Sequence, residues 1–322
     1  MNTNEVDISV VVPIFNEEEN IMVFYRRVKK VLAKLNRSRE FVFVNDGSHD
    51  QSLEVLKDLS AKDLGVKYIN FTRNFGQQAA ITAGMDHSSG KALITMDCDL
   101  QDPPELLPEL INKWEDGYDV VYARRSHRED KLFKKYSAIL YYKILQKFSD
   151  IEISGNIGDF RLIDRKVLTS LKGMREKSRY LRGMVAWLGY RYKIIDYKRP
   201  ERLFGDTGFS LLKMVRLGMA GILNFSLLPL RLGLVIGLVT IFAGFGFLSY
   251  ITYDMLIYDT IYPLYKWLSV ITFIFTGFLF ILVWIMAEYV GQIYNETKGR
   301  PIYVINDKEN FENEYEDSYS KL

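Results

Sequence analysis

Short apolar runs alternate with segments of helical periodicity through residues 1–125 of the chain. Four of the runs are rich in β-branched residues and have the length of buried strands; they lie at positions 8–12, 41–44, 67–70 and 92–96. Between the first two runs, residues 17–35 place apolar side chains at helical spacing along one face. Strands that alternate with helices predict an α/β fold in which helices wrap a mostly parallel sheet.

A polar motif follows each predicted strand at its carboxyl end. The motifs are Pro13-Ile14-Phe15-Asn16-Glu17, Asn45-Asp46-Gly47-Ser48, Arg73-Asn74-Phe75-Gly76 and the stretch from Asp97 to Glu105. Ligands of parallel α/β sheets sit beyond the carboxyl ends of the strands, so the four motifs predict one shared site. Standing alone, Asn45-Asp46-Gly47-Ser48 would be better explained as a turn that leads into a helix N-cap, but three further polar motifs at successive strand ends favour the shared site. Asn16 and Asp102 could likewise serve only to begin the helices that follow them. Capping and ligand binding are compatible.

Asp97 and Asp99 stand two residues apart directly after the fourth predicted strand. Two carboxylates so close repel each other unless a cation or a hydrogen-bond network neutralises them. We therefore expect a divalent cation here, holding the diphosphate of a sugar nucleotide. The chain has no Walker loop and no Gly-x-Gly-x-x-Gly fingerprint after the first strand, so phosphates must be held by a metal and by cationic side chains. An EF-hand would need glycine where Asp102 stands, and the three histidines lack zinc-ligand spacing.

Charge and cysteine content argue against two other classes of protein. The net charge is only +2, so nothing indicates a nucleic-acid partner. The single cysteine, Cys98, excludes an internal disulfide and fits a reducing compartment. It has no adjacent histidine, and we expect it to pack in the core rather than to act as a nucleophile.

Two long runs without a charged residue lie in the C-terminal part of the chain, at positions 232–253 and 267–287. Each is long enough to cross a bilayer as a helix, which favours two membrane-spanning helices over buried core helices. The preceding segment mixes apolar residues with Lys213 and Arg216 and predicts amphipathic helices in the membrane surface. Basic residues concentrate outside the pair of runs, so both termini and the catalytic domain are expected in the cytoplasm.

These patterns divide the chain into four parts. Residues 1–208 form the predicted catalytic domain, 209–231 the interfacial helices, 232–288 a transmembrane hairpin and 289–322 a cytoplasmic tail. The tail is acidic from Asp307 onward, and we expect it to be disordered there. The expected location is the cytoplasmic membrane, with the chain as a multi-pass protein.

As a set, the motifs resemble those of glycosyltransferase family 2. The resemblance is carried by the strand-end motifs that begin near Pro13, at Asn45 and at Asp97, with Gly158-Asp159-Phe160-Arg161-Leu162 and Arg182-Gly183. Within the family the chain looks most like the polyisoprenyl-phosphate glycosyltransferases, over about residues 8–300. The resemblance implies a GT-A (Rossmann-like) fold, a nucleotide-sugar donor, a polyprenyl-phosphate acceptor and attachment to a membrane.

The resemblance also implies roles for individual residues. The positions that match nucleoside-binding residues of the family are Pro13, Phe15, Glu17 and Asp46, with Phe15 in place of the more usual tyrosine. The positions that match ligands of Mg²⁺ or Mn²⁺ on the diphosphate are Asp97, Asp99 and Gln101. Arg125 and Arg202 match positions where the family places cations near phosphate, a role that suits guanidinium geometry.

Asp159 matches the family's proposed base. We expect it instead to orient the acceptor or to take its residual proton, with Arg161 steering the lipid phosphate, because a phosphate acceptor is largely ionised near neutral pH. A buried Asp159–Arg161 pair of structural value is the alternative. The chain departs from the family pattern at Gly208, where relatives commonly have lysine, and Arg199 or Lys213 would compensate.

The predicted activity is inverting, metal-dependent transfer of a hexose from a UDP-sugar to undecaprenyl phosphate, with glucose or N-acetylglucosamine favoured. A GDP-mannose-dependent mannosyltransferase and a non-catalytic membrane scaffold with a degenerate donor pocket are the alternatives. A processive polysaccharide synthase would need a Gln-x-x-Arg-Trp motif, which the chain lacks. The sequence leaves open the sugar, the downstream acceptor and whether the chain forms a homo-oligomer.

Overall fold

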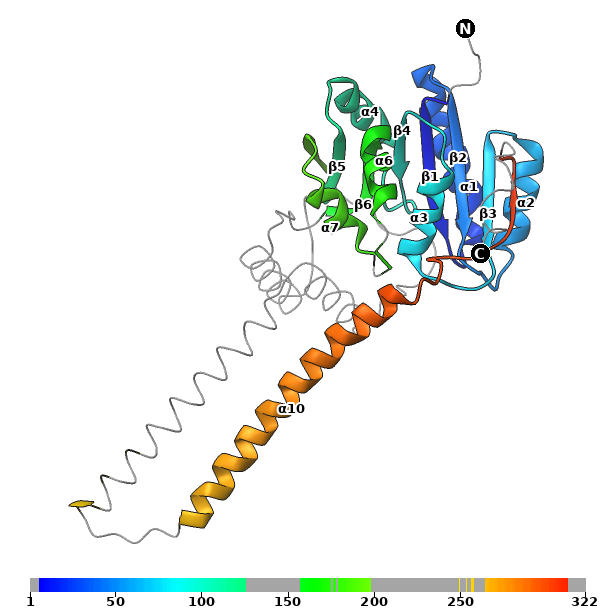
Figure 1. Ribbon diagram of the computed structural model, residues 1–322. Coiled ribbons are helices and arrows are strands. Elements are labelled where there is room, and N and C mark those ends of the chain that lie inside the picture. The colour runs from blue at the N-terminus through cyan, green and yellow to red at the C-terminus, as the bar shows by residue number, and fades with distance from the viewer. Residues whose placement is uncertain are drawn as a thin grey trace.

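The computed structural model describes residues 6–125, 157–174, 176–177, 179–197 and 264–311, with Ser249, Tyr253, Leu256 and Ile257 (Figure 1). Several sequence predictions lie outside these residues. They concern the interfacial segment 209–231, most of the uncharged run 232–253, and the positions Arg199, Arg202, Gly208 and Lys213.

One sheet runs through the described part of the chain. Its strands are β1 (Ile8–Ile14), β2 (Arg39–Asn45), β3 (Val66–Phe71), β4 (Ala92–Thr95), β5 (Val120–Arg125), β6 (Ile157–Asp164), β7 (Tyr192–Tyr197) and β8 (Ile305–Glu309). Their order in the sheet is β7-β5-β6-β4-β1-β2-β3-β8. Strands β1 to β4 pair in parallel, as do β5 and β7, whereas β6 and β8 run antiparallel to their neighbours. The predicted α/β fold with a mostly parallel sheet is confirmed.

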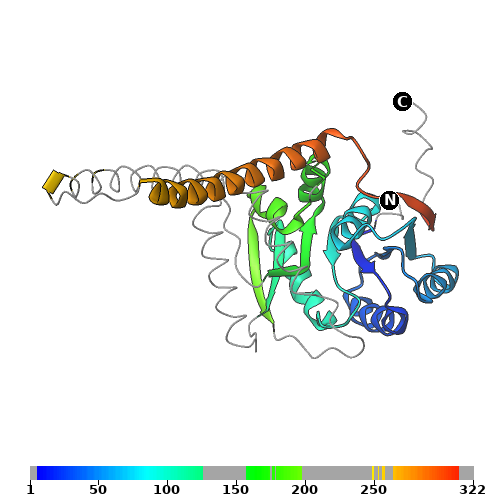
Figure 2. The same ribbon diagram turned by 90° about the horizontal axis from the view of Figure 1, so that it is seen from below.

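Helices cover both faces of this sheet (Figures 1 and 2). One face carries α1 (Glu18–Leu32), α2 (Ser52–Lys62) and α4 (Leu107–Glu115), and the other carries α3 (Gln77–His87), α6 (Arg165–Gly173) and α7 (Leu181–Trp187). Strand β1 joins the two layers because alternate side chains point to opposite faces. Val10 and Val12 pack in the core with α1, and Val11 packs in the core with α3. Cys98 is buried, as expected.

The strands predicted from apolar runs are all present. The helix predicted in residues 17–35 is also present as α1, and its last turn is the 3-10 helix η1 (Ala33–Leu35). A second 3-10 helix, η2 (Pro104–Leu106), leads into α4 after the aspartate-rich stretch. Asn16 caps neither α1 nor another helix; its Oδ1 accepts a hydrogen bond from the backbone N–H of His49 at 2.8 Å.

Helix α10 (Leu264–Thr297) projects away from the sheet as one long helix (Figure 1). It exposes a series of apolar side chains, among them Phe275, Leu279 and Val283. No helix in the described part of the chain combines the length and the hydropathy needed to cross a membrane. The predicted membrane helix at residues 267–287 lies within α10 and is not confirmed.

The segment after α10 returns to the sheet, where β8 pairs antiparallel with β3. The Asn310 side chain donates to the carbonyl oxygens of Ser60 and Val66 at 2.9 and 2.8 Å. The prediction of disorder from Asp307 onward is wrong for residues 307–309, which belong to β8. The free edge of β3 offers backbone hydrogen-bonding groups, so even a polar segment gains a partner there.

Candidate active site

The carboxyl edge of the sheet carries two different groups of side chains. One follows β4 and faces the start of β6, which reaches the same edge because it runs antiparallel to β4. We call it the charged cluster, and it consists of Asp97, Asp99, Asp102, Arg125, Asp159 and Arg182. The other lies at the ends of β2 and β3 and is largely neutral.

Asp97 lies at the centre of the charged cluster. Its Oδ1 accepts a hydrogen bond of 2.8 Å from Nε2 of Gln77, at the start of α3. Burial, and after it the negative charges of neighbouring aspartates, together raise the pKa of Asp97 to about 7. These neighbours are Asp102, Asp159 and Asp99. The carboxylate is thus under a repulsion that a bound cation would relieve.

The predicted metal ligands share one turn. Asp99 is buried and accepts a hydrogen bond of 3.1 Å from the backbone N–H of Gln101. Among the described residues, no three His, Cys, Asp or Glu side chains are grouped so that they could hold a metal ion. The repulsion at Asp97 nevertheless fits a divalent cation, since Mg²⁺ needs only one or two carboxylates and takes other ligands from water and phosphate.

Arg125 is positioned beside the carboxylates by Tyr197 and Asp102. The Tyr197 hydroxyl donates to Oδ1 of Asp102 at 2.7 Å and accepts from Nε of Arg125 at 3.2 Å. Nη2 of Arg125 lies 3.7 Å from the same Asp102 oxygen. Because its charge lowers the pKa of Asp97 and of Asp159, Arg125 belongs to the same electrostatic unit.

Asp159 forms a two-point ion pair with Arg182 of α7. Nε of Arg182 lies 3.1 Å from Oδ1 of Asp159, and Nη2 lies 2.8 Å from Oδ2. Burial raises the pKa of Asp159, but the positive charge of Arg182 and of two further arginines outweighs burial and lowers it to about 2. Asp159 is therefore ionised at neutral pH. The predicted structural pair of Asp159 with Arg161 is wrong in its partner, because Arg182 supplies the hydrogen bonds.

Arg161 is completely buried in the middle of β6. Its Nε, Nη1 and Nη2 atoms make no hydrogen bond with the residues that the structure describes. Burial lowers its pKa, whereas the charge of Asp159 raises it. Arg161 thus contributes positive charge behind Asp159, and its predicted role toward a lipid phosphate stays a prediction.

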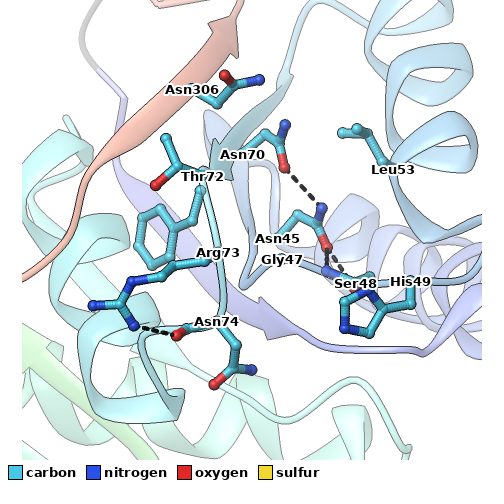
Figure 3. A pocket seen from close by; sticks show the side chains of 11 residues that line it. Asn45, Gly47, Ser48, His49, Leu53, Asn70, Thr72, Arg73, Asn74 and Asn306 are labelled. Carbon is cyan, nitrogen blue, oxygen red and sulfur yellow. Dashed lines mark hydrogen bonds between the residues drawn. The ribbon is translucent and has the colours of Figure 1, made fainter.

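A pocket of about 660 Å³ lies at the ends of β2 and β3 (Figure 3). We call it the amide pocket, and its lining residues are Asn45, Gly47, Ser48, His49, Leu53, Asn70, Phe71, Thr72, Arg73, Asn74 and Asn306. Among the described residues, no carboxylate lines it and Arg73 is its one guanidinium. Its walls therefore suit a neutral polar ring that exchanges hydrogen bonds with amides.

The predicted nucleoside-binding residues have different environments. The Phe15 ring is exposed and meets the His49 ring edge-on, with centroids 6.3 Å apart. Pro13 is half-buried in β1, and Glu17 accepts a hydrogen bond of 2.6 Å from Asn20. Phe15 is thus open to a ligand, next to a residue that lines the amide pocket.

Asp46 faces inward. It accepts hydrogen bonds from the backbone N–H groups of Phe75 at 2.6 Å and Gly76 at 2.9 Å. Burial raises its pKa, and these hydrogen bonds oppose that shift. Asp46 therefore holds the loop after β3 against the loop after β2.

Gly47 allows this contact to be close. It has a φ of +67°, and a Cβ atom placed there would lie 2.6 Å from backbone atoms of both Arg73 and Asn74. Only glycine fits this conformation and this spacing. The loop so held contacts both groups, because Arg73 lines the amide pocket and Gln77 bonds to Asp97.

Residues 9–171 match the sequence family described as Glycosyl transferase family 2. The chain belongs to glycosyl transferase family 2. Family 2 relatives match along nearly the whole chain. The uncharacterized glycosyltransferase YkcC of Bacillus subtilis (strain 168) is 42% identical over 312 residues, which cover 97% of each protein. The prophage bactoprenol glucosyl transferase homolog of Escherichia coli (strain K12) is 40% identical over 92% of this chain and 98% of that protein.

A solved structure resembles the chain more remotely. Mannosyl-3-phosphoglycerate synthase from Rubrobacter xylanophilus is 15% identical, with a TM-score of 0.48 over 67% of this chain and 72% of that one. The family assignment therefore rests on the sequence matches. They confirm the predicted resemblance, and the protein is a glycosyltransferase.

Sequence reasoning missed several residues that shape the site. Arg182 belongs to a family motif, but its pairing with Asp159, 23 positions earlier in the chain, could not be inferred from the sequence. Gln77 and Tyr197 carried no motif at all. For Tyr197 the available signal was its position at the end of a strand, which is where the site residues of this sheet gather.

Proposed function

We propose that this glycosyltransferase moves a hexose from a UDP-sugar to undecaprenyl phosphate and inverts the anomeric centre. The observation that carries the proposal is that the charged cluster and the amide pocket meet at one sheet edge, joined by residues 73–77. A sugar nucleotide has the same division, with a neutral base at one end and a charged diphosphate at the other. The name of the Escherichia coli relative, a bactoprenol glucosyl transferase homolog, supports a polyprenol-linked acceptor.

In this proposal the donor lies along the edge of the GT-A sheet. The base occupies the amide pocket beside Phe15, with Pro13, Glu17 and Asp46 shaping the loops around it. The diphosphate extends to the charged cluster, where Arg125 faces it. Arg202, outside the described residues, is proposed to add a second cation. Guanidinium groups suit this role because they donate two parallel hydrogen bonds to phosphate oxygens.

The acceptor needs little help to become a nucleophile. The second pKa of a phosphate monoester is about 6, so its oxygen is largely ionised at neutral pH. Asp159, with a pKa of about 2, is a weak base but a permanent negative charge that fixes Arg182. We infer that Arg182 and Arg161 provide positive charge for the acceptor phosphate. An acceptor oxygen attacks the anomeric carbon as the bond to UDP breaks, and attack from the opposite side inverts the centre.

Asp97, Asp99 and Gln101 would hold Mg²⁺ or Mn²⁺. When bound, the cation stabilises the negative charge that develops on the departing diphosphate. The residues of the chain do the rest: Gln77 orients Asp97, and Tyr197 with Asp102 orients Arg125. Chelation by EDTA is expected to remove activity, and added Mg²⁺ or Mn²⁺ to restore it.

We also propose that the enzyme works at the cytoplasmic face of a membrane, where its lipid acceptor is found. The support is the pair of uncharged runs at 232–253 and 267–287, the amphipathic segment 209–231 and the apolar side chains exposed on α10. The catalytic domain and both termini would lie in the cytoplasm, because basic residues flank the uncharged pair.

The test is a transfer assay with a panel of donors. Membranes that contain the full chain are incubated with undecaprenyl phosphate and with labelled UDP-glucose, UDP-N-acetylglucosamine or GDP-mannose, and the organic phase is counted. We expect label from a UDP-hexose. Label from GDP-mannose alone would favour a mannosyltransferase. If the folded chain transferred label from no donor, a non-catalytic scaffold would be favoured.

A further inference from the structure

Strand β8 brings a carboxylate to the amide pocket from the far end of the chain. Its Asn306 lines the pocket, and the next residue, Asp307, pairs in register with Asn70 of β3. Asp307 Oδ1 accepts a hydrogen bond of 2.6 Å from Nδ2 of Asn70, and its Oδ2 accepts one of 3.0 Å from the Tyr68 hydroxyl. Sequence reasoning assigned this segment no role.

A line of hydrogen bonds continues from Asp307 across the pocket wall (Figure 3). Asn45 Nδ2 donates to Asn70 Oδ1 at 2.9 Å, and the Ser48 hydroxyl donates to Asn45 Oδ1 at 2.5 Å. Ser48 Oγ in turn accepts the backbone N–H of Asn16 at 3.0 Å. The line therefore ends in the turn after β1 that carries Phe15.

The direction of the bonds in this line is set from both ends, by Asp307 at one end and, at the other, by the backbone N–H of Ser48, which donates to Asn45 Oδ1 at 3.3 Å. An ionised carboxylate accepts hydrogen bonds and donates none, so Asn70 must turn its NH₂ group to Asp307. The Asn70 oxygen then faces Asn45 and accepts a hydrogen bond from the Asn45 NH₂ group. The Asn45 oxygen therefore faces Ser48 and accepts a hydrogen bond from the Ser48 hydroxyl.

We infer that Asp307 is a positioning residue for the nucleoside of the donor: as the acceptor-only end of the line, it fixes the orientation of the Asn70 amide, which keeps Asn70 Oδ1 as the acceptor for Asn45 and so supports the turn that holds Phe15. This inference rests on the proposed function, since it names the part of the chain that prepares the base-binding end of that site. Asp307 touches no reacting atom and acts through Asn70.

A substitution that keeps the shape of Asp307 but adds a donor tests the inference. In Asp307→Asn the new amide no longer dictates the orientation of Asn70, so Asn70 can turn over and leave Asn45 Nδ2 without its acceptor, while the Ser48 N–H still holds the Asn45 oxygen. We expect the Kd for UDP and the KM for the UDP-sugar to rise about five- to tenfold, the effect of misaligning roughly one hydrogen bond. The charged cluster is unchanged, so kcat should stay within about twofold.

A swapped pair separates polarity from simple structural damage. In the double variant Asp307→Asn with Asn70→Asp, the acceptor-only group stands at position 70 and receives NH₂ groups from both residue 307 and Asn45. Asn45 regains an acceptor at position 70, and the Kd for UDP should return to within about twofold of wild type. Glu309→Gln is the matched control, because Glu309 lies on the same strand and its carboxylate accepts a long hydrogen bond of 3.5 Å from the Tyr68 hydroxyl.

The measurements use the full chain in detergent or membranes: UDP binding by calorimetry, steady-state transfer, and the thermal midpoint of each variant. A wild-type Kd in Asp307→Asn, or a double variant no better than the single one, overturns the inference. If Asp307→Asn does not fold, the double variant decides alone: UDP binding like wild type supports the inference, and weak binding overturns it. A wild-type protein that binds UDP but transfers no hexose overturns the proposed function while leaving the inference testable by binding.

Discussion

The charged cluster and the amide pocket occupy the same edge of one sheet but are built in opposite ways. The charged cluster crowds four carboxylates and two guanidiniums together, and their interactions move pKa values in both directions, up to about 7 for Asp97 and down to about 2 for Asp159. The amide pocket is lined mainly by neutral side chains, and three of them, Asn70, Asn45 and Ser48, form a line of hydrogen bonds that begins at Asp307. The charged cluster thus holds like charges close together, whereas the amide pocket holds its amide groups in fixed orientations.

This difference separates two tasks of a glycosyltransferase. Charge placed in advance stabilises charge that develops during reaction, so the charged cluster should determine kcat. Oriented amides recognise a neutral ring equally before and during reaction, so the amide pocket should determine KM. Variants in the two groups should therefore change different kinetic constants.

The largest effect is expected from Asp97→Asn. Loss of this carboxylate removes the central group of the charged cluster, and kcat should fall about 10²- to 10³-fold with little change in Kd for UDP alone. Transfer of labelled hexose into the organic phase measures it. Asp116→Asn, at an exposed end of α4, is the control and should be active. Normal turnover in a folded Asp97→Asn protein would contradict the assignment of this cluster.

Arg182→Gln tests the buried ion pair. Removing Arg182 leaves the Asp159 carboxylate buried without the two hydrogen bonds from the guanidinium, which should lower the free energy of unfolding by about 3 kcal/mol. Arg124→Gln is a matched control, because Arg124 makes a similar two-point pair with Asp196 on the surface. That pair is exposed, so its loss should cost less than about 1 kcal/mol. Equal losses in urea unfolding would mean that burial does not distinguish the two pairs.

Gly47→Ala tests the contact between the two loops. The added methyl group would meet the backbone of Arg73 and Asn74 at a positive φ, and we expect a loss of about 2 kcal/mol in unfolding free energy with weaker UDP binding. Gly189→Ala is the control. Gly189 has a similar positive φ of +68°, but nothing lies within 4 Å of an added Cβ, so only backbone strain of about 1 kcal/mol is expected. Unchanged UDP binding in Gly47→Ala would separate this contact from the donor site.

The pH dependence of stability gives the smallest effect. The pKa of Asp159 is about 2 in the folded protein, below its ordinary value of 3.8, so its ionised form stabilises the fold above about pH 4. That contribution is lost as the pH falls through 2. The stability difference between wild type and Arg182→Gln should therefore shrink between about pH 4 and pH 2. A difference that stays constant over this range would show that Asp159 has no lowered pKa.

The sequence predicted the centre of the fold better than its edges. Strands β1 to β4 are apolar because both of their faces are buried, so their composition alone revealed them. Strand β8, Ile-Asn-Asp-Lys-Glu, is polar because it lies at an exposed edge, and its composition predicted disorder instead. Only the free edge of β3, known from the folded sheet, explains why it is ordered.

For the site, the sequence likewise indicated where some residues lie but not which side chains they contact. Motifs at strand ends placed Asp97 and Asp99 at the carboxyl edge of the sheet, because the topology of parallel sheets brings such ends together. Asp159 was singled out by the family resemblance alone. Side-chain partners were not predicted: Arg161 was the alternative partner for Asp159, yet Arg182 arrives from a separate helix. Asp46 matched a ligand-binding position but bonds to the loop after β3.

The most direct test of the division between the two groups is a structure of the full chain with UDP and Mn²⁺. We expect the uracil ring to lie in the amide pocket beside Phe15. The anomalous signal of manganese should lie between the diphosphate and the carboxylates of Asp97 and Asp99. A uracil ring outside the amide pocket, or manganese bound away from Asp97, would contradict this division.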